Sequence, residues 1–117
     1  MNKRSVGTIN EDRAIEYLQK NDFVILERNF RVRQGEIDVV GLHQNCLVFV
    51  EVKFRSGNKH GEAVEAVGVT KQRQICKVSQ FYLAFHPDMG AKNIRYDVVT
   101  VVNDQVVWYQ NAFDYQH

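Results

Sequence analysis

The stretch Glu36–Arg55, EIDVVGLHQNCLVFVEVKFR, decides the fold because it reads as two β-strands joined by a tight turn. Residues 36–43 and residues 46–55 are both rich in Val, Ile, Leu and Phe, with polar side chains at alternating positions. Gln44-Asn45 between them favours a turn. The segment therefore predicts a β-hairpin, and its register determines which side chains face one another.

The register of this hairpin places acidic residues opposite each other. If the loop has two or four residues, Asp38 lies opposite Glu51 and Glu36 lies opposite Lys53. A loop of three residues would shift the strands by one position and remove both pairings. Glu36–Lys53 then reads as a cross-strand ion pair, whether or not the neighbouring acids form a site.

Two carboxylates opposed among apolar neighbours destabilise a sheet unless a cation compensates them. Mg²⁺ is suited to that role because it binds one or two carboxylates together with water and phosphate oxygens. Glu11 shares a predicted helix face with Ala14 and Leu18, the face that should pack inward. A third carboxylate converging on the same ion would explain its position. The pattern predicts a Mg²⁺ or Mn²⁺ site held by Asp38, Glu51 and Glu11.

Lys53 follows Glu51 by two residues on the same strand face. Beside a metal-bound phosphate, its ammonium could orient or help deprotonate water, or stabilise charge on the phosphorus oxygens. These residues suit metal-assisted hydrolysis of a phosphodiester. The simpler alternatives are a half-exposed sheet face whose charges neutralise one another, and a solvated Glu11. Asp97 is either a further site carboxylate or part of a salt bridge with a neighbouring strand.

The remaining sequence predicts a small α/β protein with a mixed central sheet flanked by helices. The expected order is αβββαββ, in a single domain over residues 1–117. Apart from the hairpin, the elements are helices over 5–20 and 70–86, and strands over 23–30, 93–102 and 105–108. Thr70 is the predicted cap of the second helix.

Composition mainly excludes other classes of protein. The chain has 117 residues, 44% of them hydrophobic, and two cysteines, Cys46 and Cys76, which we expect to be reduced thiols. No apolar run is long enough for a signal peptide or a membrane span. A cytoplasmic protein with no membrane partner is the expectation.

The net charge of +1 hides a basic middle region. Residues 28–77 carry nine Lys and Arg against five Asp and Glu. Such a region favours a DNA or other nucleic-acid partner, although each charge could also be an ordinary solvated one. The Gly-rich segment 56–61 could close over a substrate or merely connect elements. The candidate nucleic-acid contacts are Arg31, Arg33, Arg55, Lys59, Lys71, Gln72 and Arg73.

Aromatic residues gather near the end of the sequence. Trp108, Tyr109, Phe113 and Tyr115 are either ordinary core residues or an exposed apolar edge at which a homodimer could form. The two interpretations differ in how much of these side chains solvent reaches.

Gly35-Glu36-Ile37-Asp38, followed by Phe49-Val50-Glu51-Val52-Lys53, resembles the YraN-like family of predicted endonucleases over nearly the whole chain. The resemblance implies a restriction-endonuclease-like fold, similar to that of archaeal Holliday-junction resolvases. It also implies Asp38 and Glu51 as Mg²⁺ ligands, Lys53 as the catalytic lysine and Glu11 as the helical acid.

Three functional hypotheses follow. The first is a Mg²⁺- or Mn²⁺-dependent endonuclease, with branched DNA suggested by the analogy to resolvases. The second is a nucleic-acid-binding module that retains the acidic site without cutting. The third is a protein-interaction domain whose hairpin charges form a plain ion-pair network.

Overall fold

A computed structural model describes residues 6–55, 67–90 and 92–116. Its central element is a five-stranded sheet in the order β1-β2-β3-β4-β5, in which β3 and β4 are parallel and the other neighbours are antiparallel. The predicted order αβββαββ and the mixed sheet are confirmed. In chain order the elements are α1 (Val6–Lys20), β1 (Val24–Val32), β2 (Gly35–His43), β3 (Cys46–Arg55), α3 (Val69–Phe85), a 3₁₀ turn η1 (Pro87–Met89), β4 (Asn93–Val102) and β5 (Gln105–Phe113).

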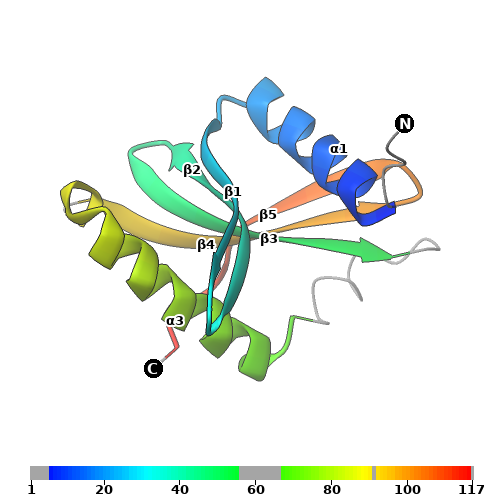
Figure 1. Cartoon of the computed structure of the whole chain (residues 1–117). Coiled ribbons are helices and arrows are strands. Elements are labelled where there is room, and N and C mark those ends of the chain that lie inside the picture. The colour runs from blue at the N-terminus through cyan, green and yellow to red at the C-terminus, as the bar shows by residue number, and fades with distance from the viewer. Residues whose placement is uncertain (1–5, 56–66, 91, 117) are drawn as a thin grey trace, which may run out of the picture.

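The two long helices cover opposite faces of the sheet, with the β1–β2 hairpin projecting alongside α3 (Figure 1). Ala14, Ile15 and Leu18 of α1 pack on one face with Val39, Val48, Val50, Val99 and Val101. The apolar stripe of α3 packs on the other face with Phe30, Ile37, Val40, Phe49, Tyr96 and Val98. Burial on both faces explains why β3 and β4 are nearly continuous runs of apolar residues.

The hairpin that decides the fold has the predicted register. Val39 pairs with Val50 and His43 pairs with Cys46. The turn is Gln44-Asn45, whose φ angles of 51° and 64° are those of a type I′ turn. Pairing ends at Val39–Val50, however, so the predicted facing pairs of charged residues lie beyond the paired ladder.

Two boundaries differ from expectation for local reasons. Helix α3 begins at Val69, with Gly68 in extended backbone as its N-cap and no side-chain cap, so Thr70 lies inside the helix. Strand β5 continues to Phe113, well past Trp108. A bulge between Tyr96 and Val98 in the β4–β5 register, with Asn111 at φ 51°, breaks the alternation that would have marked this extension.

The aromatic cluster near the chain end is largely core rather than an exposed edge. Phe113 is buried, and Trp108 and Tyr109 are half-buried against the two cores. Tyr115 alone of the four is exposed, at 42%. Cys46 and Cys76 are both free thiols, as predicted. Among the described residues, none of the helices has the length and apolar character needed to cross a bilayer.

Candidate metal and nucleic-acid site

The candidate site lies where β2 and β3 separate. Beyond the Val39–Val50 pair, the backbone N–H of Val52 donates to Oδ2 of Asp38 at 2.8 Å. A side chain of β2 thus replaces the backbone acceptor that a continued ladder would have supplied. Asp38 is half-buried at this fork.

A local reversal of the β1–β2 hairpin produces the fork. Ile37 and Val39 are two residues apart and would face the same side of a regular strand. Instead, Ile37 packs on the α3 side and Val39 on the α1 side. The neighbouring position on β1 is Asn29, whose φ of 55° lies in the left-handed region. At Asn29 and Asp38 the strand pair therefore reverses the face of the sheet toward which its side chains point. This reversal brings residues from both sides of the sheet to one place.

Glu51 of β3 is the most deeply buried acid of this cluster, with 6% exposure. The Lys71 ammonium of α3 lies 3.3 Å from its Oε2, just beyond the usual N–H···O range. Among the described residues, no hydrogen bond reaches this buried oxygen. Burial raises the pKa of Glu51 to about 8, and both a hydrogen bond with Asp38 and the charge of Asp38 add to the rise, whereas Lys71 opposes it.

Glu11 of α1 joins the same cluster from the other face of the sheet. Burial raises its pKa, and so do the charges of Asp38 and Glu36, while Arg28 lowers it. With its amide nitrogen turned toward the two acceptors, Asn29 donates to Oε1 of both Glu11 and Glu36 at 2.9 Å. Asn29 therefore links the helical acid to the strand acid.

Glu36 has a different partner from the one its sequence position indicates. Arg31, which faces it across the β1–β2 pair, donates through Nη2 at 2.6 Å and through Nε at 3.0 Å to Oε2 of Glu36. The ladder does not extend to Lys53, so the cross-strand ion pair with Lys53 is not formed. Lys53 is half-buried and has neither a hydrogen bond nor an ion pair with another described residue. Within the described part of the chain, the ammonium of Lys53 therefore has no charged partner.

The candidate metal ligands are carboxylates, but they do not form a complete coordination site. No three His, Cys, Asp or Glu side chains in the described part of the chain stand close enough together to hold one ion. Asp38 and Glu51 meet as a pair, and Glu11 interacts with Asp38 through its charge. Two carboxylates suit Mg²⁺, which binds one or two of them and completes its coordination with water and phosphate oxygens.

Two of the predicted nucleic-acid contacts form ion pairs inside the cluster, because Arg31 binds Glu36 and Lys71 approaches Glu51. Gln72 donates from Nε2 to the carbonyl of Val67 at 2.8 Å, which ties the start of α3 to the preceding segment. Arg33 and Arg73 are exposed. The Arg55 side chain, Lys59 and the predicted loop 56–61 lie outside the described residues.

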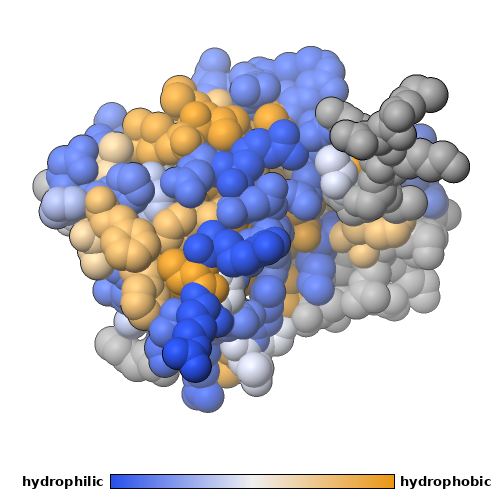
Figure 2. All heavy atoms as spheres, viewed as in Figure 1, coloured by the Kyte–Doolittle hydropathy of each residue, from blue (hydrophilic) through white to orange (hydrophobic). Residues whose placement is uncertain are grey.

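Figure 2 shows strongly hydrophilic side chains gathered over β1 and the tip of the β1–β2 hairpin, beside more apolar surface. The exposed cations of this region are Arg28, which pairs with Asp12 at 2.9 Å, together with Arg31 and Arg33. A contact from Gln74 Nε2 to the carbonyl of Gln34, at 3.1 Å, attaches the hairpin tip to α3. A basic hairpin and the basic helix α3 therefore lie next to the acidic fork.

Asp97 is structural and does not belong to the fork. It is fully buried, and Arg95, Trp108 and the backbone N–H of Asn111 all donate to its carboxylate at 2.8–2.9 Å. The salt-bridge interpretation of Asp97 is thus confirmed, but the expected neighbouring-strand partner is wrong, because Arg95 lies on the same strand, β4.

Asn29 is the one participant that the sequence does not single out, because an asparagine in a strand gives no hint of a left-handed backbone. Lys71 was expected to contact phosphate, and its approach to Glu51 depends on how α3 docks against β3.

This chain is an α/β protein with a cluster of carboxylates at a sheet fork, one of them, Glu51, buried, and with basic elements beside the fork. A sequence profile of the uncharacterised protein family UPF0102 matches residues 10–101. A UPF0102 protein of Persephonella marina is 40% identical over 92% of both chains, and one of Lachnoclostridium phytofermentans is 39% identical over 97% of both. A further UPF0102 protein, of Syntrophotalea carbinolica, is 45% identical over 83% of this chain and 78% of its own. The chain belongs to family UPF0102, which is the YraN-like family that its residues resemble.

Proposed function

We propose that this protein is a Mg²⁺- or Mn²⁺-dependent endonuclease with a restriction-endonuclease-like fold, acting on DNA. The observation that carries the proposal is the buried Oε2 of Glu51, which lacks a hydrogen bond among the described residues and lies beside a second carboxylate, Asp38. Ionising Glu51 is costly because its side chain is buried and lies beside the half-buried Asp38. A divalent cation would remove that cost and fits their oxygen donors.

The proposed roles follow from where each side chain lies. Asp38 and Glu51 hold the cation at the fork, and Glu11 adds negative charge from α1. The cation would polarise the phosphodiester and stabilise negative charge on its oxygens. Lys53 lies on the same strand, where its ammonium would orient the attacking water, or its neutral amine would accept a proton from that water.

The fold supports the proposal through the arrangement of its elements. Helices cover both faces of a mixed sheet, β3 and β4 run parallel, and the acids lie at the separation of two central strands. The exposed Arg33 and Arg73 supply phosphate contacts on the elements that border the fork.

Cleavage assays with the full chain test this function. Labelled linear, nicked and branched DNA is incubated with Mg²⁺, with Mn²⁺ and with EDTA. We expect metal-dependent cleavage that Asp38→Asn and Lys53→Ala each reduce by at least about a hundredfold. Lys20→Ala is the matched control, because Lys20 is exposed on α1 and pairs only with Glu16 among the described residues. Cleavage that survives both site substitutions would refute the assignment.

A second candidate function is binding without cleavage. It is favoured by the approach of Lys71 to Glu51, which already supplies one positive charge to the acid pair. A protein of this kind would bind DNA with a strong salt dependence and leave it intact in Mg²⁺ and in Mn²⁺.

A further inference from the structure

A groove lies between α3 and the segment that follows β5, well away from the acidic fork. One part is a pocket of about 410 Å³ whose lining includes Gln80, Tyr96, Asn111, Phe113 and Tyr115. A second pocket of about 400 Å³ is lined by Arg73 and Lys77, and shares Gln80 and Tyr115 with the first. Because two residues belong to both, the pockets form one groove with an aromatic part and a basic part.

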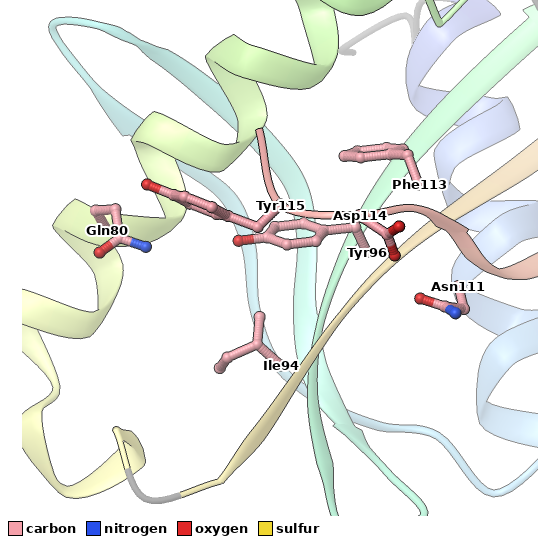
Figure 3. Close-up of a pocket in the computed structure, with 7 residues that line it drawn as sticks. All are labelled: Gln80, Ile94, Tyr96, Asn111, Phe113, Asp114 and Tyr115. Atoms are coloured by element: carbon pink, nitrogen blue, oxygen red, sulfur yellow. The ribbon is translucent and has the colours of Figure 1, made fainter. Parts of the chain in front are cut away.

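The aromatic part has a rigid floor. The ring of Tyr96 stacks between those of Phe49 and Phe113, with centroids 5.7 Å and 5.3 Å away. A hydrogen bond between the hydroxyls of Tyr96 and Ser79, 2.8 Å long, fixes the ring further. Figure 3 shows Tyr96 and Tyr115 extending toward α3, where Gln80 lies. Tyr115 is 42% exposed and lines both pockets.

Polar groups in the aromatic part are placed for hydrogen bonding. The bulge in β5 directs the backbone N–H of Asn111 to Asp97, while its side chain lines the pocket (Figure 3). Within the described residues, the side-chain amides of Asn111 and Gln80 have no hydrogen bond. The carboxylate of Asp114 lines the same pocket. Two amides and an acid beside aromatic rings match the donor and acceptor edge of a nucleobase.

The basic part lies along one side of α3. Arg73, Lys77 and Gln80 are spaced by four and three residues, which places them on one helix face. Arg73 and Lys77 are exposed, and neither forms an ion pair with another described residue. They are suited to bind the phosphate attached to a base in the neighbouring pocket.

We propose that this groove binds an unpaired nucleotide, with its base against Tyr115 and its phosphate on Arg73 and Lys77. The proposal deepens the proposed function and rests on it for the nature of the substrate, namely DNA with a single-stranded portion near the cut. A paired base cannot enter, because its hydrogen-bonding edge is already used. The groove would therefore favour single-stranded, overhanging or branched DNA over blunt duplex.

Fluorescence anisotropy in EDTA, with a labelled single-stranded 12-mer and a blunt duplex of mixed sequence, tests the groove separately from cleavage. We expect Tyr115→Ala to weaken single-strand binding by at least about fivefold and to leave duplex binding within about twofold. Tyr115→Phe should restore most of the affinity. Tyr17→Ala is the matched control, because Tyr17 is 37% exposed on α1.

A second variant keeps the test decisive if Tyr115→Ala folds poorly. Gln80→Ala changes an exposed side chain of α3 and should weaken single-strand binding without lowering the melting temperature. Titration with dAMP shows whether the groove also binds a free nucleotide or only a nucleotide within a strand. Binding of either ligand that depends on Tyr115 supports recognition of a base. Wild-type affinity of both variants for the single strand and for dAMP, or equal losses for duplex and single strand, would overturn the proposal. The binding assay contains no metal, so its result is independent of cleavage activity. A chain that never cleaves DNA can still bind a single strand through the groove, and a chain that cleaves DNA can still lack this binding.

Discussion

The Lys71 ammonium, on the first turn of α3, lies 3.3 Å from Oε2 of Glu51 on β3. Glu51 is buried beside Asp38, and among the described residues no hydrogen bond satisfies this oxygen. Lys71 therefore provides one positive charge where, on the proposed function, a divalent cation provides two. The acid pair is compensated without metal, but only in part, and a cation that binds there competes with Lys71.

Removing Lys71 should strengthen metal binding. In Lys71→Ala the repelling charge beside Glu51 is lost, so we expect Mn²⁺ to bind at least about fivefold more tightly in the absence of DNA. Isothermal titration calorimetry measures the dissociation constant. Lys77→Ala is the control, since Lys77 is exposed on the same helix and lines the groove. Equal or weaker Mn²⁺ binding by Lys71→Ala would show that Lys71 and the metal do not compete.

Glu51 should make stability fall as pH rises. Its pKa is raised from 4.5 to about 8, so its favourable contribution is complete below pH 4.5 and is lost as the pH passes through about 8. In EDTA at pH 8.5, the free energy of unfolding of Glu51→Gln should exceed that of the wild type by on the order of 3 kcal/mol, as measured by urea denaturation. The difference should vanish near pH 4. Excess Mg²⁺ should stabilise the wild type and not the variant, and parallel pH profiles in EDTA would contradict this assignment.

Asn29 combines a left-handed backbone with the link between Glu11 and Glu36. Asn29→Gly keeps the backbone conformation and loses the link, whereas Asn29→Ala loses both. We expect the stability order wild type, Gly variant, Ala variant, with the last two separated by about 1 kcal/mol. Urea denaturation measures both steps. An alanine variant as stable as the glycine variant would mean that the reversal at this position does not depend on the positive φ.

Asp97 should matter for stability alone. Asp97→Ala removes the partner of Arg95, whose side chain is only 11% exposed, and should cost about 3–5 kcal/mol. The exposed pair of Arg13 and Asp104 is the comparison, because Asp104→Ala should cost less than about 1 kcal/mol. Chemical denaturation measures both. A large change in the metal affinity of folded Asp97→Asn would instead show that Asp97 belongs to the metal site.

The fold was largely predictable because its decisive features are local. Alternating apolar residues and the Gln44-Asn45 turn specify the register of the β2–β3 hairpin, which the structure confirms. The end of that ladder could not be read from the pattern, because it depends on the left-handed Asn29 of a different hairpin. Side-chain partners were least predictable. Glu36 pairs with Arg31, its cross-strand neighbour in the β1–β2 hairpin, and not with Lys53. Lys71 reaches Glu51 through the docking of α3 against the sheet, which no spacing along the chain encodes.

A crystal structure of the full chain with Mn²⁺ shows whether Asp38 and Glu51 bind one divalent cation. Anomalous scattering identifies Mn²⁺ without ambiguity of element. We expect an anomalous peak bonded to one oxygen from each of Asp38 and Glu51, at about 2.1–2.3 Å, with Lys71 displaced from Oε2. Asp38→Asn crystals should lack the peak. An empty fork at millimolar Mn²⁺, with Lys71 still on Glu51, would show that the two acids do not form a metal site.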